Sequence, residues 1–141
     1  MDRQPLITRL GRILLGAMLL FAGTSHLTFG RAEFLAQVPR WVPLNPDLVV
    51  VLSGFVEVAL GAALVALGRR RVAVGLLTAA FFIAIFPGNV SQYMNHVNAF
   101  GLDTDSKRFV RLFLQLPLVV WALWCTDAWA WLRRPLIQGV T

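Results

Sequence analysis

Four apolar runs, each long enough to cross a bilayer as a helix, constrain this chain more than any other feature of its sequence. A hydrocarbon core of about 30 Å needs roughly 20 residues of α-helix. We predict membrane spans at about 6–29, 47–68, 72–94 and 109–132. The segments between them are short, so residues 1–141 are predicted to form a single membrane domain. The predicted fold class is all-α, an integral membrane four-helix bundle.

The composition indicates that lipid rather than water surrounds much of the chain. Hydrophobic residues make up 57% of the sequence and charged residues only 14%, against about 25% charged residues in soluble domains. The net charge of +6 would suggest nucleic acid in a soluble protein. Here the basic residues lie between apolar runs, where the positive-inside rule accounts for them. We therefore expect the lipid bilayer, and no nucleic acid, as a partner.

Four spans place both termini on one side of the membrane. With the N-terminus inside, eight arginines fall in inner segments and five basic residues in outer segments, which favours an N-in, C-in orientation. Trp129 and Trp131 then lie at the inner interface. The proline-rich segment 30–46 becomes an outer loop, and its mixture of apolar residues and arginines suits a segment lying on the outer headgroups. The inner arginines are Arg3, Arg9, Arg12, Arg69, Arg70, Arg71, Arg133 and Arg134.

Glu57 is the clearest ionisable residue at membrane depth. It lies near the middle of the second span, with Ser53 one turn earlier on the same face. Such residues are costly in lipid and usually face the protein interior. Two roles carry equal weight on position alone: a proton-carrying or ligand-binding carboxyl, and a paired structural carboxyl that locks the helices together.

The third span carries Asn89 and Gln92 on one helical stripe with His96, after Pro87, which is expected to kink the helix. Helices that are kinked and polar line cavities more readily than they face lipid. The alternative is that this stripe is simply the end of the helix as it leaves the membrane. That alternative suits His96 better than Asn89.

The fourth span places Arg111 and Gln115 on one face, and the first span ends with His26. Arg111 could instead extend to the outer headgroups, and a lone membrane histidine more often packs helices than binds metal. These groups fall in the outer half of their spans, with Glu57 below them. We predict one polar, ligand-binding pocket that opens to the outer face, formed by His26, Glu57, Asn89, Gln92, Arg111 and Gln115.

Cys125 is the single cysteine, so dithiol redox chemistry, structural zinc sites and thiolate-ligated iron–sulfur clusters lack ligands within this chain. Haem held by two histidines would need both His26 and His96, and His96 is expected to lie past the edge of the hydrocarbon. The sequence therefore argues against a metal site and against haem, and it predicts no demonstrable cofactor.

Several motifs resemble those of the DoxX-like family of small membrane proteins. They are FAGTSHL at 21–27, VPRWVP at 38–43, SGFVEVALG at 53–61, FPGNV at 86–90 and RLFLQLP at 111–117. Gly88 stands where that family more often has alanine. The resemblance implies a four-helix protein of the bacterial inner membrane. The members after which the family is named resemble subunits of a terminal quinol oxidase and of thiosulfate:quinone oxidoreduction. The resemblance therefore also makes a quinone-linked role plausible.

We therefore expect a redox-associated accessory subunit, or a protein that binds quinone or a similar amphiphile. Electrons would be carried by a membrane or redox partner protein, since no residue here carries them, and whether the chain is an enzyme stays open. The alternative is a non-catalytic assembly or interaction module, whose small faces at Gly16, Gly23 and Gly61 would suit a partner or a second copy. A small-solute transporter is less favoured, because no inverted repeat is detectable.

Overall fold

The structure is a computed structural model that describes residues 4–138, and within that range all regular structure is helical. The helices are α1 (Leu6–Leu27), α2 (Arg31–Leu35), α3 (Pro46–Ala66), the 3-10 helix η1 (Gly68–Arg70), α4 (Arg71–Met94), α5 (Asp105–Cys125) and α6 (Ala128–Gln138). Four of them, α1, α3, α4 with η1, and α5, are long and apolar enough to cross a membrane. The all-α prediction and the four helices of spanning length are confirmed.

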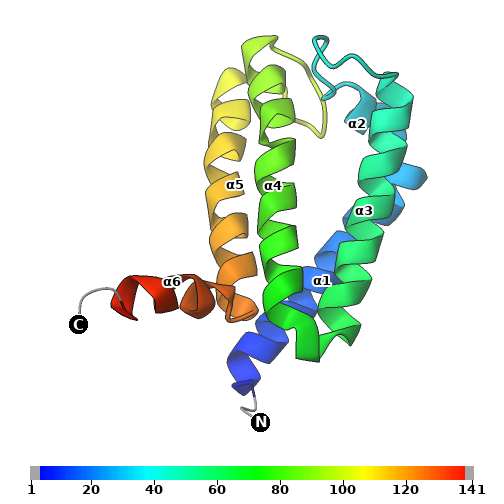
Figure 1. The fold of residues 1–141 in the computed structure, drawn as a ribbon. Coiled ribbons are helices and arrows are strands. Elements are labelled where there is room, and N and C mark those ends of the chain that lie inside the picture. The colour runs from blue at the N-terminus through cyan, green and yellow to red at the C-terminus, as the bar shows by residue number, and fades with distance from the viewer. Residues whose placement is uncertain (1–3, 139–141) are drawn as a thin grey trace.

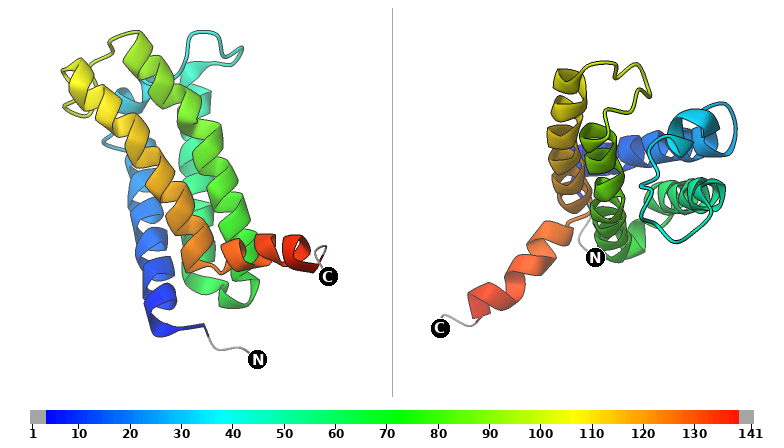
Figure 2. Two further views of the ribbon diagram at one scale, coloured as in Figure 1. Left: turned by 90° about the vertical axis from the view of Figure 1, so that its left-hand side faces the viewer. Right: turned by 90° about the horizontal axis from the view of Figure 1, so that it is seen from above.

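The four long helices form two pairs (Figure 1). α1 packs most extensively against α3, and α4 against α5, whereas contacts between the pairs are fewer. The pairs lie close together at the end that carries η1 and α6, which we call the termini end. They diverge toward the opposite end, the loop end, which carries α2 and the 95–104 connection (Figures 1 and 2).

α1 and α3 approach each other through two glycine pairs spaced seven residues apart. A Cβ atom added to Gly61 would lie 2.7 Å from the carbonyl oxygen of Gly16, and one added to Gly23 would lie 2.7 Å from that of Gly54. Small residues allow such close approach of helices in membranes. The small faces that the sequence offered to a partner are therefore used within the chain.

The two pairs meet in an apolar core near the termini end. Leu15 and Leu19 of α1 and Leu64 of α3 pack there against α4 and α5. The indole Nε1 of Trp121 in α5 also donates a hydrogen bond of 3.1 Å to the carbonyl oxygen of Gly11 in α1. The buried members contributed by α4, α5 and α6 are Val74, Ala79, Phe82, Ala122, Leu123, Cys125 and Ala128. This core is what holds the pairs together.

α3 ends at Ala66, where a side chain from α1 caps its last turn. Arg12 is only 5% exposed, and its Nη1 donates to the carbonyl oxygen of Leu64. Its Nε donates to Oε1 of Gln4 at 3.2 Å. Carbonyls in the last turn of a helix lack intrahelical partners and favour a nearby cation. Arg12, counted from the sequence as one of the inner charges, thus has an internal structural role.

The first three predicted spans match α1, α3 and α4 to within two residues at each end. The fourth differs, because its helix runs over 105–125 rather than 109–132. It begins early because the Thr104 hydroxyl accepts a hydrogen bond of 3.3 Å from the backbone N–H of Lys107 and caps the helix. It ends early because the chain turns at Thr126 and Asp127.

The turn after α5 sends α6 across the direction of the long helices (Figures 1 and 2). Asp127 has a φ of 62°, in the left-handed region. Its carboxylate accepts a bond of 2.7 Å from Nε of Arg71, so it pairs with the start of α4. The buried Thr126 fits against Gly75, where an added Cβ would lie 1.8 Å from its hydroxyl oxygen.

Candidate functional site

A cavity of about 560 Å³ lies between the two helix pairs, toward the loop end. All four long helices line it, together with the α2–α3 connection and Phe100. The walls are largely apolar, and the volume falls in the range typical of sites for single small molecules. The predicted site residues that line it are His26, Glu57, Asn89, Arg111 and Gln115.

Glu57 of α3 and His26 of α1 meet deep in this cavity, and both are buried. Nδ1 of His26 lies 2.9 Å from Oε2 of Glu57, and also 3.0 Å from the carbonyl oxygen of Ala22, one turn earlier in α1. Gly54 permits the contact, because a Cβ there would lie 2.8 Å from Cβ of His26.

The geometry leaves the carboxylate of Glu57 without an aligned donor among the described residues, and its Oε2 is fully buried. The hydrogen bond of His26 Nδ1 is directed to Ala22, and among the described residues no donor is aligned with the buried Oε2 of Glu57. Buried polar atoms normally have hydrogen-bond partners, and exceptions call for an explanation such as a ligand. The Glu57–His26 pair is therefore the point where the cavity can receive a donor from a bound molecule.

A row of rings and a guanidinium forms the roof of the cavity. The ring of Phe34 stacks on His26 with centroids 3.3 Å apart, and Phe100 meets Phe34 edge-on at 4.7 Å. The guanidinium carbon of Arg111 lies 4.9 Å from the ring centroid of Phe100. The row joins α1 through α2 and the 95–104 connection to α5. Phe34, and Val38 one turn further along the chain, line the cavity, so part of the segment 30–46 folds inward, while Arg40 and Trp41 are exposed.

α2 is fastened over the cavity by polar contacts at both sides. The carboxylate of Glu33 accepts a hydrogen bond of 2.6 Å from the backbone N–H of Phe100. Nε of Arg31 donates to Oδ1 of Asp47 at 2.7 Å, and this bond raises the pKa of Arg31 above its usual value. These contacts hold Phe34 in place against His26.

Two buried amides form the wall opposite Glu57. Nδ2 of Asn89 donates to Oε1 of Gln115 at 3.1 Å, and Nε2 of Gln115 donates to the carbonyl oxygen of Phe82 at 2.7 Å. The amides thereby join α4 to α5 while they also line the cavity. The sequence left two interpretations of the polar stripe in the third span: a cavity lining, or the end of a helix as it leaves the membrane. The position of Asn89 agrees with the first.

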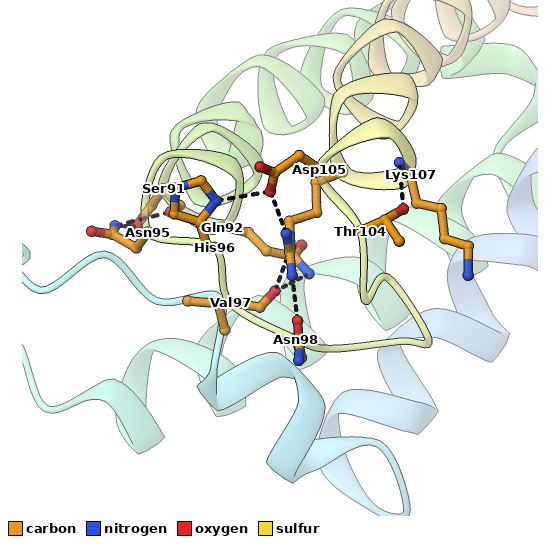
Figure 3. A network of polar contacts seen from close by, with 10 residues as sticks. Ser91, Gln92, Asn95, His96, Val97, Asn98, Thr104, Asp105 and Lys107 are labelled. Atoms are coloured by element: carbon orange, nitrogen blue, oxygen red, sulfur yellow. Dashed lines mark hydrogen bonds and ion pairs between the residues drawn. The ribbon is translucent and has the colours of Figure 1, made fainter.

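Gln92 does not line the cavity, unlike the other five predicted residues. It is 1% exposed, and its Nε2 donates to the carbonyl oxygens of Val97 at 3.3 Å and Ala99 at 3.4 Å. Because these bonds turn its amide toward the connection after α4, Gln92 supports the segment that carries Phe100. Its position is shown in Figure 3.

The 95–104 connection depends on Arg108, which the sequence did not single out. Arg108 is 4% exposed, donates from Nε to the carbonyl oxygen of Val97 at 3.1 Å, and binds Asp105 and Asn98 through its other nitrogens. Figure 3 shows these partners close to the start of α5. His96 lies on the exposed side of the same network, 2.8 Å from Oδ1 of Asp105, and does not reach the cavity.

Arg111 is half-buried in the cavity wall near the loop end. One amide position of Gln37 lies 3.1 Å from both of its terminal nitrogens and 2.7 Å from Oε1 of Gln92. With oxygen at that position Gln37 accepts from Arg111, and with nitrogen there it donates to Gln92. Arg111 thus faces Phe100, Gln37 and the cavity.

The residues missed from the sequence are Phe34, Gln37, Phe100 and Arg108. Phe34 and Phe100 belong to connections that mix apolar and polar residues, a weak signal that such segments fold inward. Arg108 follows Asp105 at i, i+3, a spacing at which side chains meet on a helix. Within residues 4–138 there is no group of three or more His, Cys, Asp or Glu side chains that could hold a metal ion.

A family match spans most of the chain. Residues 15–126 match the family described as Domain of unknown function (DUF8561). The matched range runs from the middle of α1 to the turn after α5, so it includes nearly every element that lines the cavity. No curated protein and no solved structure matches the chain.

Proposed function

We propose that this chain, which belongs to the DUF8561 family of domains of unknown function, is a multi-pass membrane protein that binds a small amphiphilic molecule between its helix pairs. The observation that carries the proposal is the buried carboxylate oxygen of Glu57, which lacks an aligned donor at the wall of a largely apolar cavity of about 560 Å³. Apolar pockets with a few convergent polar groups are typical of small-molecule sites.

Quinone is one amphiphile that fits this chemistry. Its flat ring requires an apolar slot, which the aromatic roof at Phe34 and Phe100 would provide. The carbonyl oxygens of the quinone would accept from Arg111, and the hydroxyl groups of the reduced quinol would donate to Glu57; both side chains face the cavity. The described residues contain no group that transfers electrons, so a redox role requires a partner protein. The DoxX-like resemblance supports such an accessory role in a bacterial inner membrane.

The alternative is that Glu57 and His26 only lock α1 to α3, in an assembly or interaction module. The distance of 2.9 Å between the two side chains supports this structural reading. The two proposals differ in what removing the charge of Glu57 does to binding and to stability.

Glu57→Gln is expected to weaken binding of the reduced quinol decylubiquinol, whose hydroxyl groups can donate to the carboxylate, by at least tenfold, while the melting temperature in detergent changes little. Glutamine keeps the size of the side chain but removes the carboxylate that would accept from a bound molecule. The binding is measured by quenching of tryptophan fluorescence, since Trp41 lines the cavity. Asp103→Asn, which alters an exposed acid paired with Lys107, is the control. A large fall in melting temperature with unchanged affinity would favour the structural reading.

The proposed N-in, C-in orientation places the loop end outside. The exposed arginines at the termini end support it, in line with the positive-inside rule; they are Arg9, Arg69, Arg70, Arg133 and Arg134. In intact cells, a cysteine placed at the exposed Ser106 is expected to react with a membrane-impermeant maleimide. A cysteine at Arg69 is expected to react only after lysis, and the native Cys125 is buried. The reverse pattern would overturn the orientation.

A further inference from the structure

Arg111 differs from the other buried or half-buried arginines of the described chain. Each of the others meets a carboxylate or a backbone carbonyl, whereas Arg111 meets neither among residues 4–138. The partnered ones are Arg12 with Leu64, Arg31 with Asp47, Arg71 with Asp127, and Arg108 with Asp105 and Val97. Arg111, the one arginine among the residues that line the cavity, thus lacks a counter-ion within residues 4–138.

From this difference, and resting on the proposed function, we infer that the bound amphiphile is anionic and that its acidic head group binds Arg111. A charged side chain in apolar surroundings is costly unless it is paired. A guanidinium presents its N–H groups in a planar fork that matches carboxylate and phosphate oxygens. The guanidinium carbon lies over the Phe100 ring, 4.9 Å from its centroid, and no carboxylate or backbone carbonyl among residues 4–138 accepts from the guanidinium N–H groups.

Gln37 is an uncharged partner of Arg111, so an acidic ligand would add the negative charge that Gln37 lacks. Its amide reaches both terminal nitrogens of Arg111 at 3.1 Å, but the same amide position also lies 2.7 Å from Oε1 of Gln92. If Gln37 donates to Gln92, Arg111 has no protein acceptor there. An anionic head group would then supply the acceptor oxygens and the negative charge together.

Glu57 does not neutralise Arg111, although both line the same cavity. Glu57 comes from α3 and meets His26, 2.9 Å away. Arg111 comes from α5 and meets the roof residues Phe100 and Gln37. An acidic head group bound near the roof would therefore lie apart from the Glu57–His26 pair. That pair could then accept a hydrogen bond from a hydroxyl or amine of the same ligand.

The apolar lining sets the direction of the rest of the ligand. Leu15, Leu19 and Phe82 belong both to the cavity lining and to the core near the termini end. A chain attached to the acidic head would extend from Arg111 toward these residues. The chemical class is thus a single-chain lipid acid, a carboxylate or a phosphate, whether it is free in the cell or released from the bilayer lipids.

The inference is tested on the full chain in phosphatidylcholine nanodiscs, by calorimetric titration with dodecanoate, dodecyl phosphate and the uncharged dodecanol. We expect at least one of the acids to bind tenfold or more tightly than the alcohol. Arg111→Gln is expected to remove that preference, while Arg40→Gln, an exposed arginine outside the main cavity, keeps it. Melting temperatures of both variants show whether they remain folded, and Arg111→Lys, which keeps the charge, is expected to retain part of the preference.

Equal affinity of the wild type for the acids and the alcohol would overturn the inference but leave the proposed function intact. Tight binding of decylubiquinone, without any preference for acids, would have the same meaning. Failure of every amphiphile to bind would instead contradict the proposed function itself. Mass spectrometry of lipids that co-purify with the protein distinguishes the two sources, since a free fatty acid points to a cellular pool and a lysophospholipid to the bilayer.

Discussion

Replacing Gly61 with leucine is expected to push α1 away from α3 and to lower the stability of the fold strongly. A Cβ at this position would lie 2.7 Å from the carbonyl oxygen of Gly16 and 2.8 Å from the backbone nitrogen of Leu20. Both neighbours are backbone atoms, so they can give way only if the helices move apart. Overpacking typically costs about 1–3 kcal/mol, and we expect this variant at or above the upper value.

The measurement is thermal unfolding in detergent, combined with size-exclusion chromatography. A loss of about 3 kcal/mol corresponds to a fall of about 10 °C or more in melting temperature for a chain of this size. Ala62→Leu is the matched control, because it adds the same side chain at the next residue of α3, where the surface is exposed. If both variants melt together near the wild-type temperature, the close approach of α1 and α3 is wrong.

Replacing Arg12 with methionine is expected to lower the free energy of unfolding by about 3 kcal/mol. Methionine fills much of the space of the arginine stem but donates no hydrogen bonds. The carbonyl of Leu64, at the end of α3, and Oε1 of Gln4 would both lose a charged donor. Hydrogen bonds to charged groups contribute about 1.5–3 kcal/mol each, and a buried acceptor left without a partner adds a desolvation cost.

Arg9→Met provides the comparison for this second variant. Arg9 lies nearly one turn earlier on α1, is exposed, and carries the same charge. Its replacement should therefore leave the melting temperature within a few degrees of the wild type. Equal effects of the two substitutions would show that Arg12 acts through general charge and not as the cap of α3.

Hydropathy was sufficient to predict the four long helices, because lipid imposes a minimum length and an apolar surface on any helix that crosses it. It was not sufficient to predict where the last one ends. Trp129, Trp131 and Leu132 continue the apolar run, so composition does not reveal the turn at Asp127. That turn depends on the ion pair with Arg71 from α4, a contact that is distant in sequence.

The residues of the candidate site, too, could be predicted from the sequence only in part. His26, Glu57, Asn89, Arg111 and Gln115 could be selected from the sequence because polar side chains at membrane depth are costly and turn inward. Whether each reaches the cavity depends on helix rotation, which explains why Gln92 instead supports the loop that carries Phe100. Phe34 and Gln37 lie outside the long helices, so only the tertiary fold of their connection brings them to the cavity.

The arrangement of the helix pairs has a mechanical consequence for the cavity. The apolar core joins the pairs near the termini end, while at the loop end they are bridged by side chains such as Gln37 and Phe34. A helix of the length of α5 extends about 32 Å. The pairs can therefore tilt relative to each other about this core. A tilt of about 5° would change the distance between the pairs at the loop end by about 3 Å. A small repacking around Leu15 and Phe82 would thus produce a larger displacement at the loop end. It would thereby change the size of the molecule that the cavity admits.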